Sequence, residues 1–67
     1  MEAMGTQEIY QQILHLVGRE IEVGLRGNGA ILRGKVIYTM FDSFLIDVKG
    51  KPNVIAFENI MFLQPVG

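Results

Sequence analysis

The sequence predicts a small, mainly β domain, in which one N-terminal helix precedes five strongly bent antiparallel strands that form a barrel. Three observations carry this prediction. The chain has 67 residues, which is enough for one domain covering residues 1–67. Hydrophobic residues recur at helical spacing up to Gly18 and alternate with polar residues beyond it. Turn residues then divide the rest of the chain into five short segments, as is typical of a small barrel.

The first element is predicted to be a helix over residues 6–17. Its apolar side chains recur three or four positions apart, so they share one face of a helix. These residues are Ile9, Ile13, Leu16 and Val17. Gly18 is a natural stop, because glycine readily adopts the left-handed conformation that ends many helices.

Five strands are expected between residues 20 and 65. Their predicted spans are 20–25, 30–39, 44–48, 53–57 and 60–64. The first turn includes Asn28-Gly29, a strong hairpin signal. The other connections are predicted at residues 41–43, 49–52 and 58–59. Gly34 falls inside the second strand, where a glycine indicates a sharp bend or the close approach of another backbone.

The last strand is apolar on both faces. Its residues Ile60, Met61, Phe62 and Leu63 would invite aggregation if the strand were a free edge. A neighbouring copy that adds a strand would cover it, and so would the chain's own helix. The composition is 49% hydrophobic, which is high for a chain with so little interior. We therefore expect a homo-oligomer, with these four residues as interface candidates.

The composition argues against catalysis and against metal binding. The chain has no cysteine, and its single histidine, His15, has no carboxylate close by in the sequence. We expect no enzyme, no catalytic residue, no metal and no cofactor. No window approaches eighteen consecutive apolar residues, and Met1–Gly5 lacks the basic start of a signal peptide. A cytoplasmic protein without a membrane segment is therefore expected.

Two motifs resemble those of the Sm-like (LSm) family, whose bacterial branch is the RNA chaperone Hfq. The first runs through Asn28-Gly29, Leu32, Gly34, Val36, Phe41-Asp42 and Phe44-Leu45-Ile46. The second runs from Val54 to Ile60. The resemblance covers nearly the whole chain. It implies an SH3-type small barrel, a homo-oligomeric ring of five to seven subunits, and single-stranded RNA bound around a central pore.

The resemblance also implies a binding site. The equivalent of the loop Phe41, Asp42, Ser43 and Phe44 faces the pore in the family and holds a base by stacking and hydrogen bonding. A core role for Phe44 and a turn-capping role for Asp42 are the alternatives. Glu58 and Asn59 form a second candidate element, and Asn59 also fits a purely structural corner.

The chain departs from the family in two places. Phe41-Asp42 lies further from Gly34 than usual, either because the second strand is longer or because Met40 takes the usual aspartate position. Ala56-Phe57 stands where a basic element is expected, and phenylalanine can stack on a base but cannot neutralise phosphate.

The chain's cations could still contribute phosphate contacts. The candidates for phosphate contacts are Arg26, Arg33, Lys35, Lys49 and Lys51. Arg33 and Lys35 share one strand face by parity, which would concentrate charge there. A solvated outer surface explains these residues as well. The net charge of −1 argues against general phosphate binding, although a ring would repeat any local basic rim.

The sequence is therefore compatible with three functions. The first is an Sm-like ring subunit that binds single-stranded RNA through the loop at residues 41–44. The second is an Sm-like assembly module that has lost RNA binding and contacts a protein partner, as Ala56-Phe57 and the acidic balance would favour. The third is an SH3-type barrel that recognises proline-rich peptides, against which the absence of tryptophan argues.

Overall fold

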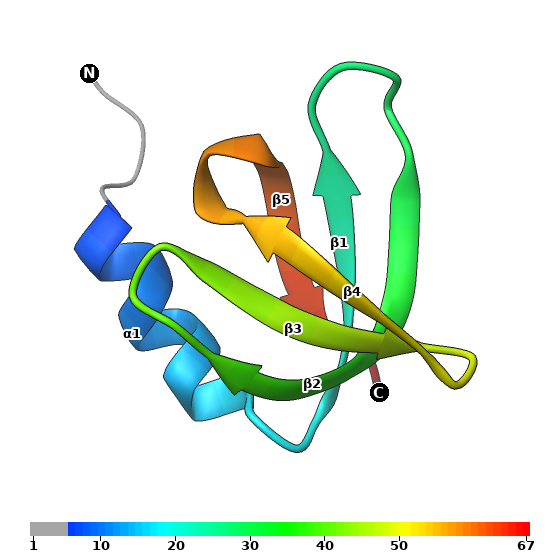
Figure 1. Cartoon of the computed structure of the whole chain (residues 1–67), viewed down its shortest axis with the longest axis horizontal. Helices are drawn as coiled ribbons and strands as arrows, with labels where there is room; N and C mark the ends of the chain where they lie inside the picture. The colour runs from blue at the N-terminus through cyan, green and yellow to red at the C-terminus, as the bar shows by residue number, and fades with distance from the viewer. Residues whose placement is uncertain (1–5) are drawn as a thin grey trace.

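The computed structural model describes residues 6–67 (Figure 1), so the prediction about Met1–Gly5 lies outside the described residues. One helix, five strands and one 3-10 turn make up the described chain. They are α1 (Thr6–Leu16), β1 (Glu20–Leu25), β2 (Ile31–Thr39), β3 (Ser43–Val48), β4 (Lys51–Ala56), η1 (Phe57–Asn59) and β5 (Ile60–Pro65). The predicted helix and the five predicted strands are confirmed, with boundaries that differ by up to two residues.

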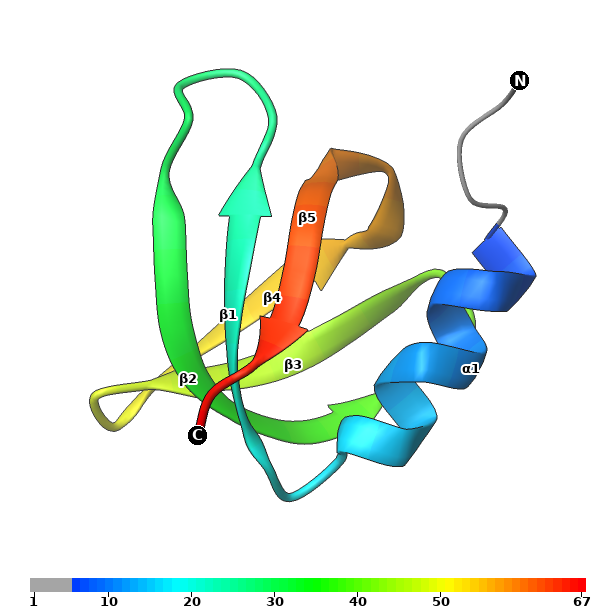
Figure 2. The same ribbon diagram turned by 180° about the vertical axis from the view of Figure 1, so that it is seen from behind.

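The five strands form one antiparallel sheet in the order β4-β3-β2-β1-β5. The sheet is strongly curved, and β2 bends so that it runs beside β1 at one end and beside β3 at the other (Figures 1 and 2). Strands β4 and β5 are the two ends of this order and do not pair with each other. The predicted barrel is therefore an open, curved sheet with two edges.

The core fills the concave side of the sheet. Its buried residues are Ile13, Ile21, Val23, Val36, Phe44, Ile46, Ile55, Phe57 and Ile60. Helix α1 packs against β2 and η1 and places Ile13 in this core. Ile9 and Leu16 are partly buried beside it, whereas Val17 is exposed. Gly18 has a φ of 86°, which ends the helix as predicted.

Strand β2 carries two features that shape the sheet. A methyl group at Gly34 would collide with the backbone carbonyl of Asp47 on β3, so the predicted close approach is confirmed. Further along, Val36 pairs with Ile46 and Tyr38 pairs with Leu45, which leaves Ile37 as an extra residue in a bulge. This extra residue adds one position to β2 between Gly34 and the Phe41 loop.

The turn predicted at residues 49–52 is shorter than expected. Val48 pairs with Lys51, so Lys49 and Gly50 alone form the turn, with φ values of 54° and 83°. Pro52 lies inside β4, opposite Asp47. An edge strand tolerates proline because the missing N–H can face away from the neighbouring strand. Pro52 therefore lies in an edge strand and not in the predicted turn.

Replacing Gly34 by alanine is expected to lower the free energy of unfolding by about 1–3 kcal/mol, the range for overpacking a filled interior. The added methyl must displace backbone, since the atom that it meets is the Asp47 carbonyl oxygen. Urea denaturation followed by circular dichroism measures the change. Gly50→Asn is the control, because a side chain there meets no atom within 4 Å and asparagine tolerates a positive φ. Equal stability of the Gly34 variant and the parent protein would contradict the close packing.

Candidate nucleic-acid interface

Two segments that the sequence singled out lie against each other. The backbone N–H of Phe57, at the start of η1, donates a hydrogen bond of 3.0 Å to the carbonyl of Asp42. Next to this bond, Ser43 on β3 pairs with Ala56 on β4. The loop between β2 and β3 is therefore held beside η1, although about fifteen residues of chain separate them. The first predicted binding element is bonded in this way to the residue that precedes the second, Glu58 and Asn59.

The loop is closed by its own hydrogen bonds. The N–H of Met40 donates to the carbonyl of Ser43 at 2.8 Å. The Thr39 hydroxyl lies 2.8 Å from the carbonyl of Met40 and 3.2 Å from that of Ser43. These bonds fix the short turn that carries Phe41 and Asp42, so both side chains extend from a defined backbone.

Phe41 is the most exposed large hydrophobic residue among those described, with 76% of its surface accessible. An aromatic ring presented in this way on a closed turn can stack on a base at little entropic expense. Asp42 is exposed as well, and its Oδ1 accepts a hydrogen bond of 3.2 Å from the Ser43 hydroxyl. An ionised carboxylate accepts hydrogen bonds only, so it suits the N–H groups of a base edge.

Phe44 belongs to the core, so the prediction that its side chain binds RNA is wrong. It is fully buried, and its ring centroid lies 6.4 Å from that of Phe57, with the rings tilted by 33°. Phe57 is 3% exposed. The Phe57 ring therefore supports the core and is not presented to a base.

The second candidate element, Glu58 and Asn59, is exposed and receives Arg26 from the turn after β1. The Nε of Arg26 donates to the carbonyl of Glu58 at 3.0 Å. The backbone N–H of Arg26 donates to the carbonyl of Asn59 at 2.8 Å. Sequence reasoning included Arg26 among the cations but did not place it against η1. A bond from a side chain to a backbone carbonyl leaves no pattern in the sequence.

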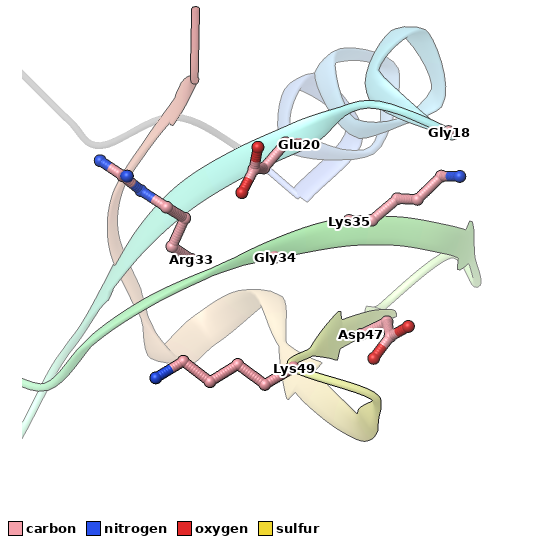
Figure 3. A pocket seen from close by; sticks show the side chains of 7 residues that line it. All are labelled: Gly18, Glu20, Arg33, Gly34, Lys35, Asp47 and Lys49. Carbon is pink, nitrogen blue, oxygen red and sulfur yellow. The ribbon is translucent and has the colours of Figure 1, made fainter.

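The cations on the outer face of β2 are matched by carboxylates. Arg33 forms an ion pair of 3.6 Å with Glu22, and Lys35 lies opposite Glu20 on β1 and Asp47 on β3. A shallow pocket opens here, lined by Gly18, Glu20, Arg33, Gly34, Lys35, Asp47 and Lys49 (Figure 3). The charged ends of Arg33 and Lys49 point to one side of this pocket and that of Lys35 to the other (Figure 3). The predicted concentration of positive charge is therefore offset locally.

The predicted interface residues separate into two pairs. Ile60 is 9% exposed and Leu63 packs against the core, so their side chains face the interior of the subunit. Met61 and Phe62 are 60% and 40% exposed. This exposure contradicts the alternative in which the chain's own helix covers the strand. At the other edge of the sheet, Val54 on β4 is 64% exposed.

No protein-family model and no curated protein matches the chain. Within residues 6–67, no helix has the length and apolar character needed to span a bilayer. The same residues contain no cluster of three or more histidine, aspartate or glutamate side chains arranged to hold a metal ion.

Proposed function

We propose that the protein is an Sm-like ring subunit that binds single-stranded RNA at the loop carrying Phe41, Asp42 and Ser43. The observation that carries this proposal is the bond between Phe57 and Asp42, which holds the loop beside η1, and in the proposed site both elements belong to one surface. Single-stranded RNA is recognised by exposed aromatic rings and hydrogen-bonding groups, and this surface presents both.

The proposed assembly uses the two sheet edges. Strands β4 and β5 each pair on one side only, and their exposed residues Val54, Met61 and Phe62 are apolar. In the proposed ring, β5 of one subunit adds to β4 of the next and continues the sheet across the interface. The two edges are different surfaces, so the contact is head-to-tail, and such contacts close into rings when the rotation per subunit allows it.

The ring supplies binding strength that a single loop lacks. One stacked base contributes about 1–3 kcal/mol, which is too little for stable binding of RNA by one subunit. A ring repeats the loop once per subunit. An RNA strand bound at one loop therefore encounters the loop of the next subunit at a high effective concentration.

Phe41→Ala is expected to weaken RNA binding and to leave the ring assembled, because the deleted phenyl group stacks on a base and supports no core contact. The expected weakening is about 1–3 kcal/mol for each base that is stacked. Titration of labelled oligo-uridine and oligo-adenine by fluorescence anisotropy measures it, with light scattering to confirm the oligomer. Phe41→Tyr keeps an aromatic ring and is the matched control. The proposal fails if the parent protein shows no salt-sensitive binding at tens of micromolar.

A second function has an observation in its favour. Phe57 is buried where the family carries a basic residue, and apolar residues Tyr38 and Val54 are exposed on the outer face, on either side of Leu45. A ring that binds a protein partner through this face would use the exposed apolar residues and would need no basic group at the position of Phe57. Light scattering that shows a ring, together with titrations that show no RNA binding, would support this function over the first.

A further inference from the structure

The proposed RNA site needs a positive charge that its own two segments do not supply. The loop contributes the carboxylate of Asp42, and η1 contributes that of Glu58. Phosphate contacts provide much of the affinity of proteins for nucleic acids. With Phe57 in the core, any cation at this site must come from another part of the chain.

We infer that Arg26, from the turn after β1, supplies this cation and contacts a backbone phosphate of the bound RNA. This inference rests on the proposed RNA site. It is motivated by the two hydrogen bonds that tie Arg26 to η1, from Nε to Glu58 and from the backbone N–H to Asn59. The turn after β1 and η1 both lie in the upper part of Figure 1, away from the connection at Gly18 that borders the outer pocket.

The Nε bond orients the guanidinium group for a ligand. Arginine has five N–H donors in a planar fork, and the carbonyl of Glu58 takes the one at Nε. The four donors on the terminal nitrogens are then presented in a plane that the Nε bond has fixed. A planar fork of this kind matches the oxygens of a phosphate group.

A short series of hydrogen bonds links this cation to the base-binding loop. Arg26 bonds to Glu58 and Asn59, and Phe57 at the other end of the same turn bonds to Asp42. The three-residue turn η1 is therefore attached on one side to the cation and on the other to the loop that carries Phe41. Arg33 makes a useful contrast, because its charge already faces Glu22.

Arg26→Gln is the variant that tests the inference. The amide nitrogen of glutamine is separated from Cα by the same number of bonds as the Nε of arginine. It can therefore donate to the Glu58 carbonyl while the positive charge is removed. Arg33→Gln removes one charge from the outer face and serves as the matched control. Affinity for oligo-uridine is measured for both variants and the parent protein at several salt concentrations, together with the thermal unfolding midpoint.

The Arg26 variant is expected to bind about tenfold more weakly for each phosphate that Arg26 neutralises, as for removal of a charge-assisted hydrogen bond. The slope of log affinity against log salt should fall by about 0.7 for each such phosphate. The Arg33 variant should match the parent protein in both quantities.

Three outcomes would contradict the inference. Unchanged affinity and slope in the Arg26 variant, with binding still sensitive to Phe41→Ala, would overturn it and leave the RNA site standing. Weaker binding with an unchanged slope would also overturn it, since the role of Arg26 would then be structural. Absence of binding by the parent protein would overturn both the inference and the proposed function.

Discussion

Phe44→Ala is expected to lower the free energy of unfolding by about 3–5 kcal/mol, the range for removing a buried aromatic side chain. Phe44 is fully buried and packs against Phe57 within the core. A single small core of this size supplies only about 3–5 kcal/mol of net stability. The variant is therefore expected to be largely unfolded as a free subunit, which far-UV circular dichroism and urea denaturation would show.

Phe41→Ala is the matched control for this prediction, because it removes the same ring three residues earlier in the chain. Phe41 is 76% exposed, and surface substitutions of this kind usually change stability by less than about 0.5 kcal/mol. Phe44→Leu, which keeps an apolar side chain in the core, should fall between the two. Similar stability of the two alanine variants would show that Phe44 does not pack as the structure has it.

The contrast between these two phenylalanines shows where sequence reasoning reached its limit. Both belong to the stretch Phe41-Asp42-Ser43-Phe44, which the sequence presented as one candidate loop. Strand β3 begins at Ser43, and from there parity turns Phe44 and Ile46 inward. The parity of β3 relative to β2 depends on the bulge at Ile37, and no residue type in the sequence marks that bulge.

Features with a local cause were predictable from the sequence. The change from helical to alternating spacing located the helix and the strands, and Gly34 indicated a close approach because only glycine fits there. Contacts between distant segments were not predictable. Arg26 and Glu58 are 32 residues apart, and their bond uses a backbone carbonyl that every residue has. The open sheet is another such feature, since closure depends on the summed twist of five strands.

Phe62→Asp is expected to convert the proposed ring into monomers. Phe62 lies on the edge strand β5, and its ring covers Gly24 on β1, where an added side chain would collide with it. In the proposed ring this surface lies at the contact with the neighbouring subunit. An unpaired carboxylate buried there would lose its hydration without gaining a partner, at a penalty of several kcal/mol. Light scattering at micromolar concentration measures the dissociation of the oligomer.

Leu14→Asp provides a closely matched control, because Leu14 is 41% exposed and Phe62 is 40% exposed. Both variants add one charge to an exposed apolar position, but Leu14 lies on α1 and not on an edge strand of the sheet. A head-to-tail ring contains one contact for every subunit, so Phe62→Asp weakens every contact at once and its effect on assembly is multiplied. Circular dichroism should show that both variants keep the fold. If the two variants assemble equally well, the β5 edge is not the interface, and a parent protein that is itself monomeric would remove the basis for a ring.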